Sequence, residues 1–340
     1  MSELRLAPIN QQWVAIARNR RDRPMEFVPM EQLRQQMICP FCKGNEEETP
    51  SALAAYRADG SILLNNEDLS NWSARVIPNR YPSFSFRATE DRDQPDLGNQ
   101  SYGPFEFNHS QGIQELIIPS SRHVSSLSEL SDRALQLSFR ACRDRLEHAK
   151  SLEYIKHAML FMNCRLAAGA SLGHIHYQLL GTPVISESVT SRTHRAEAYW
   201  NENGRSMMVD LANWEIAEGA RIVDSTDNFC IVCPFASRFP FQVWIIPRNE
   251  KFNFVSCDEA VRNDLASHCR NIVTKYEATL DTPAYNLLFH ANPFGAVNGQ
   301  MNYFELFPRL TIAAGFELGT DIWVNPVTPE SAARRLRPED

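Results

Sequence analysis

The strongest constraint on the fold of this 340-residue sequence is an order of segments that occurs twice. The first half has strand-like runs on either side of a helical stretch, in the order "SARVIPNRYPSF", "IQELIIPSS", helix, "AMLFMNCR" and "GHIHYQLLGTP". The second half has "DNFCIVCPFASRFPFQVWIIPRNE", a helical stretch "SCDEAVRNDLASHCRNIVTKYEATL", and then "AYNLLFHANP" and "QMNYFELFPRL". This self-similarity predicts two copies of a unit of roughly 150 residues, each a strand meander with a helix.

The predicted fold class is α+β. Twenty prolines, fourteen glycines and many short β-branched or aromatic runs indicate strands separated by numerous connections. Between them, Leu130, Leu135, Phe139 and Leu146 have helical spacing, and Ser131 is placed to cap that helix. Each repeat is therefore expected to form an antiparallel sheet packed with helices.

The duplication also predicts where the repeats begin and end. We expect an N-terminal repeat over residues 1–190 and a C-terminal repeat over residues 208–332. The linker "SRTHRAEAYWNENGRSMM", near residues 190–208, is expected to be partly helical. A polar tail, "SAARRLRPED", is expected to close the chain.

Charge and composition exclude several classes of partner. The net charge is −7, so no global positive field exists to hold nucleic acid or an anionic membrane. A phosphate ligand would need a local cluster, such as "RNRRDRP" at residues 18–24. No run approaches the roughly 18 apolar residues of a membrane span, and the N-terminus lacks the pattern of a signal peptide. Eight cysteines are too sparse for a disulfide scaffold, so we expect a cytoplasmic protein.

Two histidines lie one residue apart in "ASLGHIHYQLLGTP", which otherwise reads as a buried strand. In a strand, His174, His176 and Gln178 would share one face. One interpretation is a solvent-facing surface that happens to carry two imidazoles. The other is a functional site, because the preceding Gly-Ala-Ser-Leu-Gly loop has backbone amides that can approach an anion closely.

A C-x-x-C pair, Cys39 and Cys42 in "ICPFCKGNE", has the spacing at which two thiolates bind one Zn²⁺. A redox pair or two buried thiols are the alternatives. Cys230 and Cys233 lie in the apolar run "FCIVCPF" and are expected to be core residues. A tetrahedral site then needs two more ligands, for which the candidates are His123 and His174, with His109 as a substitute.

Together these segments resemble a known family. The stretches are "QQWVAIARNRRDRP", "CPFCKGNEEETP", "ARVIPNRYPSF", "RHVSSLSEL", "FMNCRLAAGASLGHIHYQ", "CPFASRFPFQVWIIP" and "AGFELGTDIWVNPVTPESAA". The sequence is similar, nearly from end to end, to the galactose-1-phosphate uridylyltransferase branch of the histidine triad superfamily. The last stretch is especially similar to the subgroup that includes plant ADP-glucose phosphorylases. The resemblance implies two tandem histidine-triad-like repeats and a homodimer.

The resemblance also implies roles for individual residues. Cys39, Cys42, His123 and His174 would bind a structural Zn²⁺, and His176 would attack the α-phosphorus of a nucleotide sugar. Gln178 would hydrogen-bond the phosphoryl oxygens. The remaining positions would bind substrate: Arg20, Arg23, Asn79, Asn163, Gly169 and Ser171 in the same chain, and Phe316 and Glu317 in the C-terminal segment that completes the partner's pocket.

These residue types suit the implied chemistry. A neutral imidazole is a good nucleophile toward phosphorus at pH 7, and a covalent nucleotidyl-histidine divides one displacement into two steps. A hydrogen bond from Nδ1 of His176 to a backbone carbonyl would leave Nε2 to attack. Gln178, Ser171 and loop amides can meet the charge on the phosphoryl oxygens.

Three departures from the family pattern concern specificity and the second repeat. Ile175 stands where many relatives have proline between the two histidines. Met301 and Tyr303 replace a second histidine pair, so we expect no second metal site, although His290 and Glu305 are present. Thr311 stands where many uridylyltransferases have lysine. The second repeat is expected to be a degenerate copy that contributes part of a pocket.

The leading functional hypothesis is nucleotidyl transfer between a UDP-hexose and a hexose 1-phosphate, as in galactose metabolism. One alternative is a phosphorylase that uses inorganic phosphate as acceptor, of the ADP-glucose type. Another is a zinc-stabilised nucleotide-binding protein without turnover.

Overall fold

The structure is a computed structural model that describes residues 3–6, 13–16, 38–64, 69–85, 100–296 and 298–337. Its strands are β1 (Glu3–Leu6), β2 (Trp13–Ile16), β3 (Ala54–Arg57), β4 (Ile62–Leu64), β5 (Trp72–Pro78), β6 (Gln100–Tyr102), β7 (Phe105–His109), β8 (Ile113–Ile118), β9 (His157–Cys164), β10 (Tyr177–Thr182), β11 (Ile222–Ser225), β12 (Phe229–Val232), β13 (Val243–Pro247), β14 (Tyr285–His290) and β15 (Tyr303–Pro308). The α-helices are α1 (Asp132–Ser151), α2 (Glu187–Asn203), α3 (Met207–Glu218), α4 (Glu259–Leu280), α5 (Gly315–Thr320) and α6 (Pro329–Leu336), with 3-10 turns η2 (Glu46–Glu48), η3 (Leu127–Glu129) and η4 (Leu166–Ala168).

Eleven strands of the described chain form one sheet, in the order β11-β12-β13-β15-β14-β9-β10-β8-β5-β3-β4. The paired neighbours in it are antiparallel, including β9 and β14, which join the two halves of the chain. Outward from this junction the order is β9, β10, β8, β5 on one side and β14, β15, β13, β12 on the other. The α+β class with an antiparallel sheet is thus confirmed.

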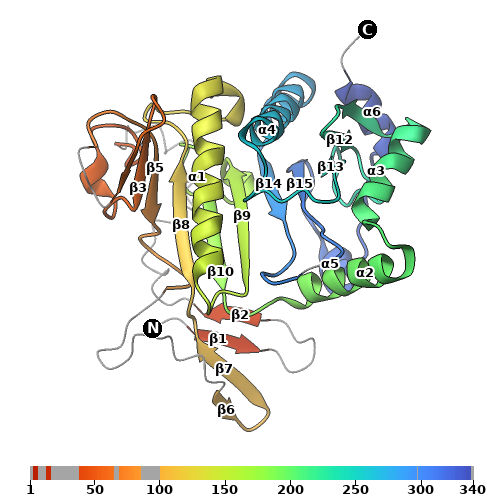
Figure 1. Cartoon of the computed structure of the whole chain (residues 1–340), viewed down its shortest axis with the longest axis horizontal. Helices are drawn as coiled ribbons and strands as arrows, with labels where there is room; N and C mark the ends of the chain where they lie inside the picture. Colours follow the sequence, from red (N-terminus) through yellow and green to blue (C-terminus); the bar gives the residue numbers. More distant parts are fainter. Residues whose placement is uncertain are drawn as a thin grey trace.

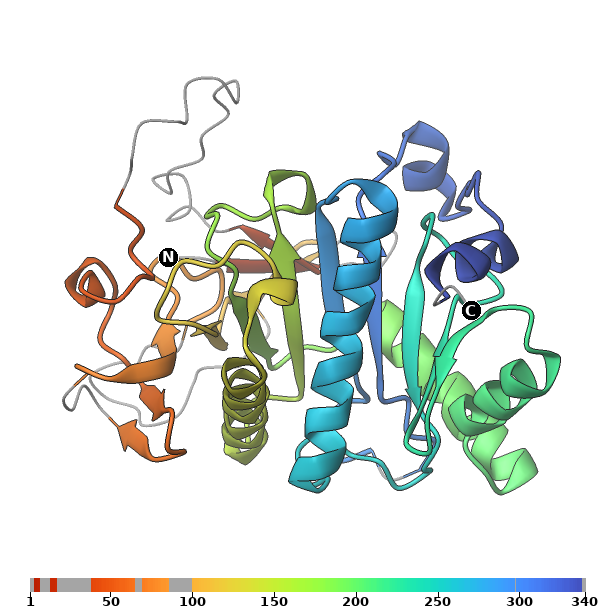
Figure 2. The same ribbon diagram turned by 90° about the horizontal axis from the view of Figure 1, so that it is seen from above.

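Helices α1 and α4 lie side by side on one face of this sheet (Figures 1 and 2). α1 packs on β5, β8, β9 and β10, whereas α4 packs on β13 and β15. The start of α1 is capped as predicted, because the Ser131 hydroxyl accepts a hydrogen bond from the Ala134 amide at 3.3 Å. Leu135 and Leu146 of α1 are buried in the core that the two helices share with the sheet.

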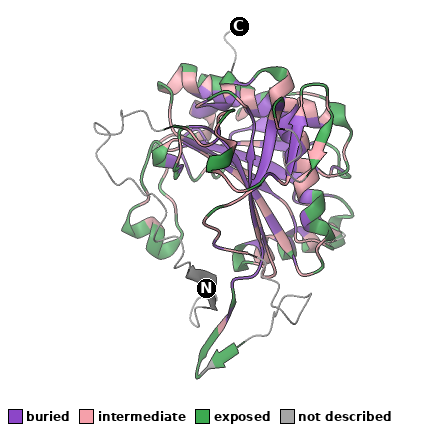
Figure 3. Cartoon of the chain, turned by 90° about the vertical axis from the view of Figure 1, so that its left-hand side faces the viewer, coloured by how far each residue is buried: buried purple, intermediate pink, exposed green. Residues whose placement is uncertain are grey.

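Side chains on the strands alternate between the two faces of the sheet, as strand geometry requires. Along β9, Leu160 and Met162 are buried in the core beneath the helices, while Phe161 and Asn163 lie on the opposite face and are only partly buried. Figure 3 shows the buried residues concentrated in the central strands and the inward sides of the helices. The face opposite α1 and α4 is therefore where polar side chains of the central strands can reach a ligand.

Two apolar clusters cover the ends of that opposite face. The segment that contains Phe41 packs with Trp72 and Ile118 over the β3, β5 and β8 end. At the other end α2 and α3 pack on β12, β13 and β15 through Ala196, Met208 and their neighbours. α2 also occupies the segment that the sequence marked as the linker. The division into repeats at residues 1–190 and 208–332 stays a prediction.

Two boundaries differ from the sequence-based expectation. β10 begins at Tyr177, so His174 and His176 precede the strand instead of lying in it. The reason is local, since Nδ1 of His176 bonds the carbonyl oxygen of His174 at 3.0 Å and the Ile175 amide donates to the Val124 carbonyl. The expected polar tail is helical over α6, where the Thr328 hydroxyl caps the first turn and Pro329 stands at its start.

Further elements lie outside the repeated segments. A second sheet of four strands has the order β2-β1-β7-β6, and β3 and β4 form a hairpin. Among the described residues, each helix is too short or too polar to cross a membrane.

Candidate functional site

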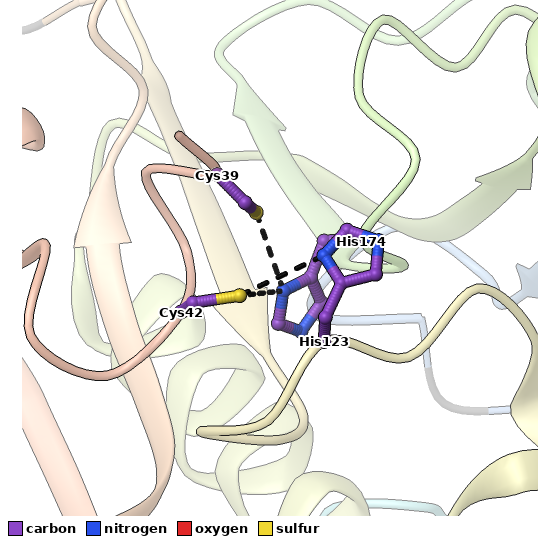
Figure 4. Close-up of side chains that lie close together, drawn as sticks. All are labelled: Cys39, Cys42, His123 and His174. Atoms are coloured by element: carbon purple, nitrogen blue, oxygen red, sulfur yellow. Dashed lines mark hydrogen bonds between the residues drawn. The ribbon is translucent and has the colours of Figure 1, made fainter. Parts of the chain in front are cut away.

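Four potential metal ligands from three separate segments converge at one end of the sheet. Cys39 and Cys42 lie in the turn before η2, His123 follows β8, and His174 precedes β10 (Figure 4). Their ligand atoms all lie within 4.8 Å of one another. Nδ1 of His174 is 3.6 Å from Sγ of Cys39 and 3.7 Å from Sγ of Cys42. Nδ1 of His123 is 3.6 Å from Sγ of Cys42. Two sulfur and two nitrogen donors thus face a common centre.

The protonation of these groups suits a metal centre. Burial, together with the neighbouring His123 and His176, lowers the pKa of His174 to about 4, so its imidazole is neutral. Burial, together with the hydrogen bond and charge of Cys39, raises the pKa of the Cys42 thiol to about 11. Two neighbouring thiolates therefore need a cation between them, which a bound metal ion provides.

Backbone and side-chain hydrogen bonds hold the cysteine turn against the sheet. The Lys43 amide donates to the Ser121 carbonyl at 2.8 Å, and Nδ2 of Asn45 donates to the Cys39 carbonyl at 2.9 Å. The buried Arg75 of β5 donates to the Thr49 hydroxyl at 3.1 Å and to the Pro40 carbonyl at 3.4 Å. The position of the two thiols is consequently fixed by β5 and by the loop after β8.

Phe41, between the two cysteines, connects the Cys/His cluster to His176. Its ring meets the His176 ring edge to face with centroids 5.1 Å apart, and the His174 ring with centroids 6.0 Å apart. Phe41 is only 4% exposed and His176 is also 4% exposed. Both histidines thus project toward one aromatic ring, although neither belongs to β10.

The tautomer of His176 follows from its backbone contact. A carbonyl oxygen only accepts, so the 3.0 Å contact with the His174 carbonyl places the proton on Nδ1. Nε2 then carries the lone pair of the neutral ring, as the sequence predicted. An imidazole held in this way can act as a nucleophile or as a general base.

Asn163 and Gly169 lie beside the position of His176. Tyr177 pairs with Met162 in the β9–β10 ladder, and the next residues on the two segments are His176 and Asn163. A Cβ added to Gly169 would lie 3.6 Å from Nδ2 of Asn163, so this side chain adjoins the loop after η4. Gly169 has φ of +91°, which favours glycine. An amide donor and a glycine loop therefore accompany the histidine.

Known proteins of the same length share this architecture. A family model described as "Galactose-1-phosphate uridyl transferase, C-terminal domain" matches residues 192–338. An ADP-glucose phosphorylase from Arabidopsis thaliana is 29% identical, with 98% of this chain and 92% of that protein covered. A galactose-1-phosphate uridylyltransferase from Thermotoga maritima is 25% identical, with 99% and 98% covered. The crystal structure of an Arabidopsis thaliana ADP-glucose phosphorylase with bound ADP-glucose superposes with a TM-score of 0.74 at 26% identity, over 100% of both chains.

The comparisons thus match residues 192–338 to the galactose-1-phosphate uridyl transferase family, and the whole chain is similar to its members. Within this family it is similar to ADP-glucose phosphorylase. Family members named by these comparisons are enzymes, transferases and phosphorylases.

The other site residues predicted from the uridylyltransferase resemblance are spread over the sheet. Gln178 is in β10 and 8% exposed, and Ser171 is exposed in the loop between η4 and β10. Asn79 follows β5, and its Oδ1 accepts a hydrogen bond from the Tyr81 amide at 2.9 Å. Arg20 and Arg23 lie outside the described residues.

Phe316 and Glu317 lie in α5, which follows β15. The Glu317 carboxylate accepts a hydrogen bond from the Ala314 amide at 3.1 Å, at the start of its own helix. Phe316 is 55% exposed. The structure thus groups the Cys/His set, His176, Asn163 and Gly169, while α5 stands apart on a surface segment.

The second half of the uridylyltransferase fold carries a different buried polar cluster. Nδ1 of His290 accepts from Arg192 at 3.1 Å, and Nε2 of His290 lies 2.5 Å from a Glu305 carboxylate oxygen. Tyr303 stacks on His290 with centroids 4.6 Å apart. In the described part of the chain, the Cys39/Cys42/His123/His174 set is the one convergent group of metal-ligand atoms.

Sequence reasoning missed two residues of the site. Phe41 could have been suspected, because it lies within the C-x-x-C motif itself. Asn286 of β14, whose side chain bonds Asn163, has no local signal, since its position depends on the pairing of β9 with β14.

Proposed function

We propose that this protein transfers a nucleoside monophosphate from a nucleoside diphosphate sugar to an anionic acceptor through a covalent nucleotidyl-His176. The observation that carries the proposal is the buried His176 imidazole, whose Nδ1 is fixed on the His174 carbonyl beside Asn163 and the Gly169 loop. Similarity over nearly the whole chain to an ADP-glucose phosphorylase and to a galactose-1-phosphate uridylyltransferase supports it.

In the first step, Nε2 of His176 attacks the α-phosphorus and the bond from that phosphorus to the bridging oxygen breaks. The sugar 1-phosphate leaves with the bonding electron pair. The new nucleotidyl-imidazolium keeps its Nδ1 proton on the His174 carbonyl, which stabilises the positive charge. Gln178, Ser171 and Asn163 are the side chains proposed to meet the negative charge on the phosphoryl oxygens.

In the second step, an oxygen of the acceptor anion attacks the same phosphorus and His176 leaves as neutral imidazole. With inorganic phosphate as acceptor, the product is a nucleoside diphosphate. Similarity to ADP-glucose phosphorylase over the whole chain supports ADP-glucose as donor and phosphate as acceptor. Similarity to the Thermotoga maritima uridylyltransferase supports the second candidate, a UDP-hexose with a hexose 1-phosphate as acceptor.

We propose that the Cys39, Cys42, His123 and His174 set binds a structural Zn²⁺. Around a tetrahedral zinc ion with two sulfur and two nitrogen ligands, neighbouring sulfur and nitrogen atoms are about 3.5 Å apart. The distances of 3.6, 3.6 and 3.7 Å between these atoms fit that geometry. When bound, the ion would supply the positive charge that two thiolates require and would fix the segment that leads to His176.

We further propose that the protein acts as a homodimer in a reducing compartment, the cytoplasm. The eight cysteines are free thiols, which suits such a compartment. The segment around α5 exposes several large apolar side chains, which suits burial against a second copy: Leu310, Ile312, Phe316, Leu318, Ile322 and Val324. Sedimentation of the wild type and of Ile312→Asp would test this, and a monomeric wild type would contradict it.

Incubation with ADP-glucose and UDP-glucose labelled at the α-phosphate tests the enzymatic proposal. We expect acid-labile label on the wild-type protein and none on His176→Gly, with folding retained. His194→Ala, at an exposed histidine of α2, is the control and should label normally. Phosphate added to the labelled protein should release a labelled nucleoside diphosphate if the phosphorylase activity holds. A hexose 1-phosphate should instead release a labelled nucleoside diphosphate sugar if the protein is a transferase. Nucleotide binding without any label would indicate a binding protein instead.

A further inference from the structure

Asn286, in the second half of the chain, contacts the strand and the loop of the proposed nucleotide site. This residue lies in β14, is 8% exposed, and pairs across the sheet with Asn163 of β9. Its Nδ2 donates two hydrogen bonds, one to Oδ1 of Asn163 at 2.8 Å and one to the Ala168 carbonyl at 2.9 Å. The two partners belong to the strand and the loop that precede His176.

These two contacts fix which way both carboxamides point. A backbone carbonyl accepts hydrogen bonds and cannot donate them, so the Ala168 carbonyl requires the amide nitrogen of Asn286 beside it. The second N–H of the same nitrogen then needs an acceptor, which is Oδ1 of Asn163. Nδ2 of Asn163 consequently points away from Asn286 and is presented as a donor.

This donor, Nδ2 of Asn163 in β9, lies beside the loop after η4. A Cβ at Gly169 would lie 3.6 Å from Nδ2 of Asn163, and no closer protein atom would meet it there. The same loop is tied to the second half again, because Arg165 donates to the Thr282 carbonyl. Arg165 holds φ of 70° and ψ of 163°, a backbone conformation that is costly for any residue except glycine. Contacts from the second half therefore hold the loop in a shape it would not adopt alone.

We propose that Asn286 is a positioning residue, which orients the Asn163 amide and the 165–169 loop toward a phosphoryl oxygen of the substrate. This inference rests on the proposed nucleotidyl transfer at His176. Asn286 itself does not touch the substrate. It acts by fixing the orientation of Asn163. Because the Asn163 amide already points toward the phosphoryl group, it does not have to reorient when negative charge develops there.

A double-mutant cycle tests this relation. The rate of nucleotidyl-enzyme formation is measured by rapid quench for the wild type, Asn163→Ala, Asn286→Ala and the double variant, each at saturating labelled nucleotide sugar. We expect each single change to slow the step by about tenfold or more, as loss of a donor to a phosphoryl oxygen does. The double variant should be no slower than Asn163→Ala, because Asn286 has nothing left to orient.

Asn302→Ala is the matched control. Asn302 is also a buried asparagine of the second half, and its Nδ2 donates to the Phe252 carbonyl at 3.0 Å without contacting the first half. We expect its rate to stay within about twofold of the wild type, since a lost buried hydrogen bond alone should not move this step. If Asn286→Ala does not fold, Asn286→Asp replaces it, because it keeps the shape and removes both donors.

The outcomes separate this inference from the proposed function. If the wild type becomes labelled on His176 but Asn286→Ala reacts at the wild-type rate, the positioning role is overturned while nucleotidyl transfer stands. Additive losses in the double variant overturn it as well, since they show that Asn286 acts independently of Asn163. If the wild type takes up no label, the proposed function fails and this inference fails with it.

Discussion

The two halves of the sheet satisfy their buried polar groups in different ways. In the first half, Cys39, Cys42, His123 and His174 bring four donor atoms together with no carboxylate or guanidinium among them. In the second half, one imidazole is engaged at both nitrogens, since Arg192 donates to Nδ1 of His290 and Glu305 lies at its Nε2.

Glu305 completes the second arrangement. Besides His290, its carboxylate accepts hydrogen bonds from Gln242 and, at 3.3 Å, from Arg238. Burial opposes its ionisation, but the hydrogen bond and charge of His290 and the charge of Arg238 hold the pKa of Glu305 below its usual value. The comparison teaches that one sheet can carry a cluster of four metal-ligand atoms in one half and, in the other, a histidine that is hydrogen-bonded to arginine and glutamate. If the proposed zinc binding holds, only the first of these two clusters would depend on a metal.

The largest expected effect is that of Cys39→Ser. We expect metal content to fall from about one ion per chain to near zero and the free energy of unfolding to fall by more than about 4 kcal/mol, as when a structural metal is lost. Elemental analysis and denaturant unfolding measure the two quantities. Cys257→Ser, at a partly buried cysteine of the second half, should keep its metal. A Cys39→Ser protein with normal metal content would remove Cys39 from the ligand set.

Glu305→Ala should break the second half instead. It leaves buried His290 and Gln242 without their acceptor, which costs about 3 kcal/mol, at the lower end for a broken buried pair because Arg238 can turn to water. Metal content should not change. Glu147→Ala is the control, because Glu147 forms an exposed i,i+4 pair with Arg143 that is worth under about 0.5 kcal/mol. An equal loss of unfolding free energy in the two variants would show that the buried network around Glu305 stabilises the fold no more than an exposed ion pair does.

Phe41→Leu should disturb the contact between the Cys/His cluster and His176, because the Phe41 ring touches both. The leucine keeps the site apolar, so the unfolding free energy should fall by only about 1 kcal/mol. The ring contact that fixes His176 is lost, however, and we expect nucleotidyl-enzyme formation to slow by about tenfold with substrate affinity nearly unchanged. Phe235→Leu, at an exposed phenylalanine of the second half, should leave the rate unaltered. A Phe41→Leu rate equal to the wild type would mean that the metal turn does not position His176.

Local sequence patterns predicted much of this fold. The 3.6-residue spacing and the serine cap identified α1, and the repeated order of apolar runs identified the strands around both α1 and α4. The cap and proline at Thr328 and Pro329 would have revealed α6, but the polar composition after them suggested a tail. Cys230 and Cys233 are buried as expected, because an apolar run bounded by turns is the usual signature of a core strand.

Site residues could be predicted where they have a characteristic spacing in the sequence. They could not be predicted where their position depends on the pairing of strands that are far apart in the sequence. The spacing of the C-x-x-C motif predicted the two thiol ligands. His123 and His174, which the family pattern named, are distant in the sequence but do converge on them in the structure. Strand periodicity placed His174 and His176 in β10, but a side-chain bond to the backbone and a contact with Val124 end the ladder at Tyr177. Asn286 could not be found from the sequence, because its role arises from the β9–β14 junction between the halves.

The smallest expected effect is an acid sensitivity at His157, where the two halves meet. His157 begins β9, and burial together with the charges of Arg192 and His290 lowers its pKa to about 4, against a backbone hydrogen bond at Ala291. Because this pKa is below that of the unfolded chain, the neutral ring contributes full stability above about pH 6.5. As the pH falls from about 6.5 to about 4, the unfolded chain binds a proton at His157 and the folded protein does not. The contribution to stability is lost over this range.

His157→Gln removes the titrating group and should flatten the dependence of unfolding free energy on pH over that window. His157 is partly exposed to water, which weakens the effect. We therefore expect the unfolding free energy of the variant to fall by about 1 kcal/mol less than that of the wild type across the window. Urea unfolding at several pH values between 4 and 7 measures it. His148→Gln, at an exposed histidine of α1, should alter the profile less. If both variants keep the wild-type slope, His157 is not the source of the acid sensitivity and the protons act elsewhere in the chain.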